Sequence, residues 1–482
     1  MIPFARNALG FLIVAAAAGC AVGPNYQRPK TSAPAQWASP LAGGETNLPT
    51  ADAGWWKSFH DPELDSLIAR AGQSNLDLRA AWSRVREARA ESALVSGELG
   101  PTVDAAGSYA RTRYSANGFP PFPPGIPLDA DVYQAGFDAT WELDLFGGIR
   151  RAREAANAEA AAAEFGRRNL FISVFGEAAR NYIEARAYQR RLEVAEDNIK
   201  AQQDVLSLTR DLAEHGLGSD LDVKQAEALL ATTESQVPSF ETGYQDAAHH
   251  LAVLLGQQPG ALLLELSNAV PVPAAPPEVP IGLPSDLMQR RPDIQQAERE
   301  LAAATARIGA ATADLFPKFS LTGDVGLQSI STSDWFTGGS RYWTAGPTVQ
   351  WRIFDTGRIR ANIHIQNERE EQALAGYEET VLAAFEDVEN GLTAYAKEQV
   401  RRESLARAVE ANQQALGLAQ DLYRKGLADY LRVLESQRAL FESQDALIAS
   451  ESQVSLDLIA IYKALGGGWE QEAEIAKAGN AR

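Results

Sequence analysis

Residue types that perform catalysis or bind metals are present in this chain, but their spacing matches no reactive site. The five histidines lack the spacing of metal ligands, and they are His60, His215, His249, His250 and His364. Close carboxylates such as Asp387 and Glu389 are usual on any solvated helix. The sequence has no phosphate-binding loop, dinucleotide fingerprint or nucleophile elbow. We therefore expect no catalytic residue, no metal site and no cofactor beyond a covalent lipid.

One residue is placed for covalent modification: Cys20, the only cysteine in the chain. It follows a basic residue, Arg6, an apolar run from Leu9 to Ala18 and a glycine, an order typical of a secretory signal. This context resembles a bacterial lipobox. The resemblance implies removal of residues 1–19 as a lipoprotein signal peptide and acylation of Cys20, with palmitate among the chains. Ala21, in place of an aspartate, implies passage to the outer membrane. A chance cysteine at the end of a signal peptide is the alternative.

Charge and hydropathy limit the partners. The net charge of −19 argues against nucleic acid, which needs a basic face. After the signal no run of about 20 apolar residues occurs, so no transmembrane helix is predicted. Any insertion into a membrane would therefore use β-strands.

The elements that would position any site are laid out twice along the chain. Trp141 and Trp351 are 210 residues apart, as are Gly216 and Gly426. This register holds over more than 100 residues without a gap. A locked register predicts long helices, because one inserted residue rotates every later side chain off its face.

The duplication gives the expected domain boundaries. They are a lipidated linker at 20–60, a first repeat at 61–258, a Pro-rich crossover at 259–284, a second repeat at 285–467 and a C-terminal tail at 468–482. Each repeat is predicted to run helix, strand, loop, strand, helix, tip, helix. The crossover should be neither a helix nor a central strand, and should run along the outside of the helical body.

Four stretches alternate apolar and polar residues, which predicts strands with two different faces. They lie at about 101–114, 132–146, 317–330 and 342–355. Their length of about ten residues and their terminal aromatics fit a transmembrane β-barrel. A soluble sheet with one wet face is the alternative. Four strands cannot close a barrel, so several chains would have to contribute.

Two proline-free runs, Gly147 to His215 and Gly357 to Lys425, predict helical rods of roughly 100 Å. The helices should turn at tips formed by 215–223 and 424–433, where a glycine supplies a left-handed C-cap. Ser219 or Asp220 in the first tip, and Asp429 in the second, could cap the next helix. A seven-residue repeat after the second tip, which includes Val433 and Leu440, predicts a coiled-coil seam.

Three features in this order carry a family resemblance. They are the start Gly19-Cys20-Ala21-Val22-Gly23-Pro24-Asn25-Tyr26, the element Arg290-Arg291-Pro292-Asp293-Ile294 and the two Gly-Leu tips. Over nearly the whole mature chain the sequence resembles the outer-membrane factors of tripartite efflux systems, the TolC-like family, on its NodT/OprM-like lipoprotein branch. The resemblance implies an α+β membrane protein with an internal duplication. It also implies a homotrimer, whose four strands per chain close one 12-stranded outer-membrane β-barrel, continued by a long periplasmic α-helical barrel of coiled coils.

The same resemblance implies a function and partners. The chain would be a passive exit duct for small molecules, as in multidrug resistance, and no enzyme. It would work with a periplasmic adaptor (membrane fusion) protein and an inner-membrane pump of the RND type, in contact with outer-membrane lipid. A lipid-anchored periplasmic coiled-coil scaffold without a channel is the alternative.

Site residues also follow from the resemblance. The residues at the adaptor-contact positions are Gly216, Leu217, Ser219, Gly426 and Leu427. The periplasmic aperture would carry Glu435 and Arg432, and Arg432 stands where some members have an acid, which argues against a simple double acidic ring. Tyr423 would either hold the closed tip by a hydrogen bond or pack in the coiled coil.

Overall fold

The computed structural model describes residues 21–39, 44–46, 54–118, 123, 125–276 and 279–471, so Cys20 and the signal peptide lie outside the described residues. The chain forms two compact units. Unit 1 holds the described residues up to Pro29, together with Val85–Ala163 and Ala297–Tyr377. Unit 2 holds Lys30–Arg84, Glu164–Gln296 and the residues from Glu378 onward.

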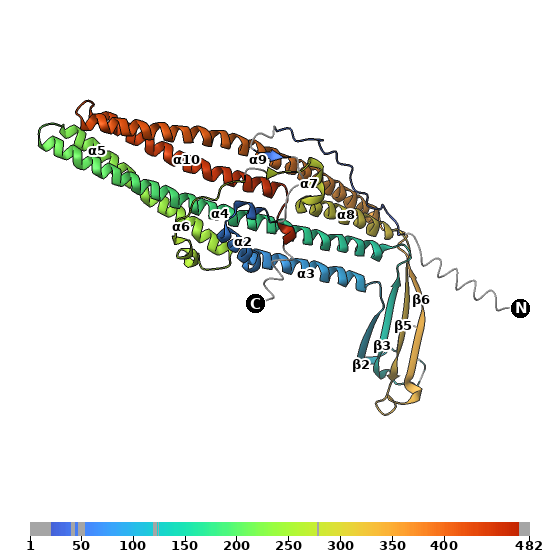
Figure 1. The fold of residues 1–482 in the computed structure, drawn as a ribbon. Coiled ribbons are helices and arrows are strands. Elements are labelled where there is room, and N and C mark those ends of the chain that lie inside the picture. The colour runs from blue at the N-terminus through green and yellow to red at the C-terminus, as the bar shows by residue number, and fades with distance from the viewer. Residues whose placement is uncertain are drawn as a thin grey trace. The chain divides into compact units, whose positions relative to one another are not determined.

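Unit 1 contains an antiparallel sheet of four strands in the order β2-β3-β5-β6 (Figure 1). The strands are β2 (Thr102–Arg113), β3 (Asp129–Leu143), β5 (Lys318–Ser329) and β6 (Arg341–Gln350), with a short 3-10 turn, η4 (Gly338–Ser340), before β6. All four lie where the alternating pattern predicts strands. β3 and β6 end earlier than predicted, because the chain turns sharply toward the following helices at Gly147 and Thr356, both with positive φ.

A duplicated tryptophan fixes the foot of the sheet. Trp141 Nε1 donates to the carbonyl of Leu99 at 2.8 Å, at the end of the preceding helix. Trp351 Nε1 donates to the carbonyl of Leu315 at 3.0 Å in the second copy. The sequence repeat therefore preserves a strand-to-helix hydrogen bond.

The two faces of the sheet differ in chemistry. Phe137, Val325 and Trp343 lie in register on one face, and all three are exposed. One residue along, Asp138 and Asp324 lie in register on the other face. Because neighbouring residues of a strand point to opposite sides, the predicted alternation gives one apolar and one polar face.

Two helices of 67 residues each, α4 (Gly148–Glu214) and α9 (Arg358–Arg424), confirm the prediction from the proline-free runs. Before the strands come α3 (Leu76–Gly97) in the first repeat and α8 (Pro292–Ala313) in the second. Among the residues that the structure describes, no helix is both long and apolar enough to cross a membrane.

The remaining elements lie in unit 2. The α-helices are α2 (Pro62–Ser74), α5 (Asp220–Glu234), α6 (Val237–Leu254), α7 (Pro284–Arg290) and α10 (Tyr430–Ala464). The 3-10 turns are η1 (Trp55–Phe59), η2 (Pro259–Leu262), η3 (Glu265–Ser267) and η5 (Trp469–Gln471). Two short strands, β1 (Glu45–Thr46) and β4 (Val279–Pro280), pair in parallel.

Two predicted helices are each split in the structure. The helix after the first tip breaks between α5 and α6, because Pro238, in the first turn of α6, has no N–H to continue the ladder. The helix predicted at the start of the first repeat, before the strand at about 101–114, breaks at Asn75, whose Oδ1 accepts from the N–H groups of Asp77 and Leu78 and starts α3.

The crossover at 259–284 differs from its prediction. It forms two short 3-10 turns and β4, so it is not free of helical structure. It also does not run only over the outside, because Leu262, Leu266, Val279 and Ile281 are buried in the main apolar core of unit 2. The prolines prevent a long element but leave these side chains able to pack.

Candidate functional site

The two helical turns in unit 2 share one backbone geometry. Gly216 and Gly426 have φ of 72° and 69°, the left-handed conformation that glycine adopts without strain. The next residue closes the helix in each case, with Leu217 N–H donating to Leu212 O at 2.8 Å and Leu427 N–H donating to Leu422 O at 2.9 Å. The predicted glycine C-caps are confirmed, and both are Schellman motifs.

The helix starts beyond these turns differ. Ser219 Oγ accepts from Leu221 N–H at 3.1 Å, and Asp222 accepts from the N–H of Ser219 at 3.3 Å, so Ser219 caps α5. Asp429 occupies the N-cap position of α10 but its side chain makes no capping hydrogen bond. The prediction that the Asp429 side chain caps α10 is therefore wrong. Asp220, the alternative cap of the first turn, is not an N-cap because it is the first residue of α5 itself.

Each turn exposes the leucine that follows its glycine. Leu217 is 76% exposed and Leu427 is 72% exposed. Both follow the left-handed glycine, where the backbone turns outward and packing partners are few. An exposed leucine beside a glycine without a side chain makes a small apolar knob on an accessible backbone, a combination that suits contact with another protein.

Behind the turns, α4, α5, α9 and α10 share a small apolar cluster. Tyr423 OH donates to Thr209 Oγ1 at 3.4 Å, and its ring meets the edge of Tyr430 with centroids 5.8 Å apart. Burial raises the pKa of Tyr430 to about 12, so its hydroxyl stays neutral at ordinary pH. Tyr423 thus makes a hydrogen bond between α9 and α4 and also packs in the cluster, and its role in holding a closed tip stays a prediction.

The other two aperture candidates, Arg432 and Glu435, lie on α10. Arg432 and Glu435 are exposed, and neither forms an ion pair with another of the described residues. In the first repeat Gln225, 210 residues before Glu435, is half-buried on α5. The carboxylate at this position is therefore present in the second repeat alone.

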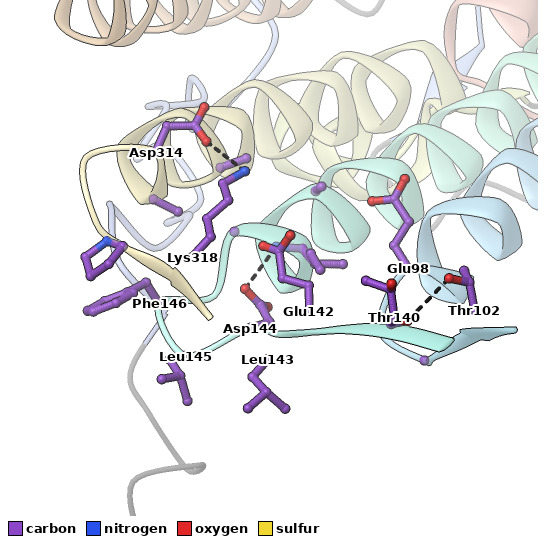
Figure 2. A pocket seen from close by; sticks show the side chains of 17 residues that line it. Glu98, Thr102, Thr140, Glu142, Leu143, Asp144, Leu145, Phe146, Asp314 and Lys318 are labelled. Carbon is purple, nitrogen blue, oxygen red and sulfur yellow. Dashed lines mark hydrogen bonds and ion pairs between the residues drawn. The ribbon is translucent and has the colours of Figure 1, made fainter. Parts of the chain in front are cut away.

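A pocket of about 400 Å³ lies in unit 1 at the foot of the strands (Figure 2). Figure 2 shows four acidic side chains and one lysine around it, namely Glu98, Glu142, Asp144, Asp314 and Lys318. Asp144 accepts from the N–H groups of Ile149 at 3.2 Å and Arg150 at 2.8 Å, so it caps α4. Asp314 pairs with Lys318 at 3.2 Å.

Two carboxylates of this pocket, Asp144 and Asp314, therefore serve local structure. Asp355 caps α9 in the same way, and the N–H groups of Ile359 and Gly357 lower the pKa of Asp355. Among the described residues no group of three or more His, Cys, Asp or Glu could hold a metal ion. The sequence gives a signal for this pocket, an aspartate shortly before a glycine at the start of each long helix, but its role as a cap was not predicted.

The segment that follows Cys20 is fixed beside the end of β3. Val22 N–H donates to Phe146 O at 3.0 Å, and Arg151 donates to Val22 O at 3.2 Å and to Asn25 Oδ1 at 2.6 Å. Tyr26 OH donates to Glu298 at 3.2 Å, and burial raises its pKa to about 12. Cys20 itself, the predicted lipidation site, lies outside the described residues.

Arg291, part of the Arg-Arg-Pro-Asp element, proves to be a junction in unit 2. Its guanidinium donates to Asp293 at 2.6 Å, to Asp387 at 3.0 Å and to the carbonyl of Ala464 at 2.9 Å. Burial lowers the pKa of Arg291, but the two carboxylates more than reverse this, so the charge is held. Its motif is visible in the sequence, but no local signal identifies the partners on α9 and α10.

Comparison with known proteins gives consistent matches over both repeats. A family model described as outer membrane efflux protein matches residues 67–257 and 283–467. The chain is similar to the toluene efflux pump outer membrane protein TtgC of Pseudomonas putida, with 34% identity over 459 residues and 94% of each chain covered. It is 35% identical over 453 residues to the pyoverdine export outer membrane protein OpmQ of Pseudomonas putida, covering 91% of this chain and 93% of that protein. The solved structure of the outer-membrane channel OprN matches with a TM-score of 0.87 and 37% identity, over 94% of this chain and 100% of that one.

Proposed function

The chain belongs to the outer membrane efflux protein family, and from this we propose that it is the outer-membrane exit duct of a tripartite efflux pump. It is an outer-membrane efflux protein of the bacterial cell, and its α+β fold is that of the channel OprN. The duct conducts small molecules passively and performs no chemistry on them. Toluene and pyoverdine, in the names of two relatives, illustrate the size range of such cargo.

The observation that carries the proposal is the chemistry of the unit 1 sheet. Its apolar face, with Phe137, Val325 and Trp343, is exposed along all four strands. Large exposed apolar surface on a sheet is costly in water and favourable against lipid. The opposite face, with Asp138 and Asp324, suits a water-filled lumen.

We propose a homotrimer because it is the assembly of the family, and the open edges of the sheet support an assembly of several chains. Among the described residues β2 and β6 each have one neighbour in the sheet, so one edge of each strand carries unpaired N–H and C=O groups. In a membrane these groups must be paired. Three chains joined edge to edge give twelve strands in one closed β-barrel, and the long helices would continue it as a periplasmic α-helical barrel.

We assign the far end of the helices to partner contact and gating. The turns at Gly216 and Gly426 present Leu217 and Leu427 to a periplasmic adaptor, while Ser219 holds the first turn in shape. An inner-membrane pump, of the RND type, would supply the energy. Glu435 and Arg432, exposed on the first turns of α10, would line the aperture, and Tyr423 would hold its helices together through Thr209.

We also propose that Cys20 carries the lipid anchor. The chain two residues later is bonded to Phe146, directly beyond the end of β3. An acyl anchor at that level would meet the membrane beside the strands, with no long linker to cross. Replacing Cys20 by alanine should abolish acyl labelling of the mature protein.

The assembly is tested by electrophoresis of the full chain from isolated outer membranes. Without heating, we expect a trimer band that collapses to a monomer on boiling, because closed membrane barrels resist detergent. If the protein is instead a lipid-anchored scaffold without a channel, its band should not shift with heat. Its attachment to the membrane during alkaline extraction should then depend on the lipid alone.

A further inference from the structure

Two glutamines interrupt an apolar seam between α4 and α10 in unit 2. The seam positions recur every three, four or seven residues and are buried: Ala195, Gln202, Val205 and Thr209 on α4, and Tyr430, Val433, Gln437 and Leu440 on α10. This is the spacing of core positions in a coiled coil. Gln202 is 3% exposed and Gln437 is 2% exposed, so both amides are out of water.

The contacts on either side place the two glutamines at one level. Arg191 donates to Asp445 at 2.6 Å, and Asn198 Nδ2 donates to Gln444 Oε1 at 2.9 Å. Nearer the turns, Val205 and Leu206 share an apolar cluster with Tyr430 and Val433. The two helices run in opposite directions, so residue numbers rise along α4 and fall along α10 toward the turns. Gln202 on α4 and Gln437 on α10 both lie between the Asn198–Gln444 bond and this cluster.

The amide groups of this pair are unsatisfied. Neither the oxygen nor the nitrogen of Gln202 or Gln437 has a hydrogen-bond partner among the described residues. Other amides of the bundle are bonded, since Asn412 Nδ2 donates to Ser443 Oγ at 3.0 Å. A buried amide that gives up water without a replacement partner destabilises the packed state. The seam is therefore weakened at one defined level, behind the turns.

We propose that Gln202 and Gln437 determine how readily α10 separates from α4 and so how readily the tip end of the duct opens. Separation at this level would admit water and restore hydrogen bonds to both amides, which lowers the free-energy difference between packed and separated helices. Apolar side chains of similar size would regain no hydrogen bonds with water when the helices separate. The proposal rests on the channel function proposed above, because it concerns the opening of that channel.

The test replaces both amides by a side chain of similar volume in the full chain, Gln202→Leu with Gln437→Leu. Hydrogen exchange of the neighbouring α4 and α10 amides should slow about tenfold, since the packed seam is stabilised. In planar bilayers the mean single-channel conductance should fall at least about threefold. Gln203→Leu is the matched control, because Gln203 is exposed on α4 next to Gln202. It should change neither quantity.

A second variant reverses the sign. Gln437→Glu buries a charge in the seam, so exchange should accelerate and conductance should rise. The proposal is overturned if the double leucine variant exchanges and conducts like wild type or like Gln203→Leu. A wild-type protein that does not conduct contradicts the channel function instead, and the exchange measurement then still decides whether the glutamines weaken the seam.

Discussion

At the residue scale, the two repeats differ in charge at the position proposed for the aperture. Glu435 on α10 and Gln225 on α5 occupy equivalent places in the duplicated sequence, but only the first is charged. Three chains would bring three such carboxylates toward one opening. Charge at a narrow opening acts strongly on passing ions, because the surrounding protein confines the field.

We expect Glu435→Ala to increase single-channel conductance and to reduce the preference for cations, because a side chain is shortened and a negative charge removed. Conductance and reversal potential in planar bilayers measure the two effects. Gln225→Ala is the control and should leave the reversal potential unchanged. An unchanged reversal potential in the Glu435 variant would show that this residue is not at the aperture.

The turn glycines are a second residue-scale prediction. Gly426→Val places a β-branched residue at a φ of 69°, at a cost of about 1–2 kcal/mol, and covers the backbone beside Leu427. We expect resistance that depends on the adaptor to be lost while trimers still form. Gly417→Ala, inside α9 with open space around it, should retain resistance. Normal resistance in the Gly426 variant would remove this turn from the adaptor contact.

How much of the site the sequence predicts depends on how local its geometry is. The left-handed glycines at 216 and 426 were predictable, because helix length, glycine and the next helix start are adjacent in the chain. A hydrogen bond by Tyr423 is one of two alternatives that the sequence offers, and its partner Thr209 is not predictable because it lies 214 positions away. The third residue of the next helix distinguishes the two caps, because Asp222 accepts from Ser219 N–H whereas the equivalent residue after Asp429 is Arg432, which has no acceptor.

At the scale of elements, Arg291 joins three parts of unit 2 through Asp293, Asp387 and the end of α10. Arg291→Ala should lower the free energy of unfolding by about 2–3 kcal/mol, because charged hydrogen bonds are lost and two carboxylates lose their partner. Chemical denaturation followed by circular dichroism measures this.

The neighbouring Arg290 is the control for that measurement. Its contact with Glu470 is longer, at 3.6 Å, and lies nearer the surface. Arg290→Ala should cost less than about 1 kcal/mol. Equal losses for the two variants would contradict the junction role of Arg291.

A carboxylate on α9 makes the N-terminal segment sensitive to acid. Glu389 accepts from Ala38 N–H at 2.7 Å and from Ser39 N–H at 2.9 Å. Burial raises the pKa of Glu389, but these donors outweigh it, and the pKa lies below the ordinary value of 4.5. A lowered pKa contributes stability that is complete above 4.5 and is lost as pH falls through the folded-state pKa.

We therefore expect hydrogen-exchange protection of Ala38 and Ser39, corrected for intrinsic rates, to be constant near neutral pH and to fall below about pH 4.5. Glu389→Gln, which cannot ionise, should show weaker protection without this pH dependence. Constant wild-type protection down to about pH 3 would contradict the role of the carboxylate.

The elements themselves were predictable where one physical rule dominates. The alternation of apolar and polar residues predicted the four strands, and the absence of proline predicted α4 and α9. The split between α5 and α6 differs from the prediction of one helix although Pro238 marks it, because proline is tolerated in the first turn of a helix and the sequence does not show where α6 begins. The break at Asn75 was missed because an asparagine cap resembles an ordinary polar helix residue.

At the scale of the whole molecule, the internal duplication would multiply the sites of contact with the adaptor. In the proposed trimer, two helical turns per chain would give six similar contact points for the adaptor, while Glu435 and the unbroken α10 distinguish the second repeat from the first. The number of chains could not be deduced from periodicity alone. The proposed number of three rests on the family, and the sheet edges that need partners support an assembly of several chains.

The most direct test of this account is single-channel recording with the purified full chain in planar bilayers. The account predicts discrete conductance steps of one size that appear only with the heat-sensitive trimer and vanish when it is boiled. Folded trimers that insert into the bilayer but produce no steps would contradict the assignment of the protein as an exit duct.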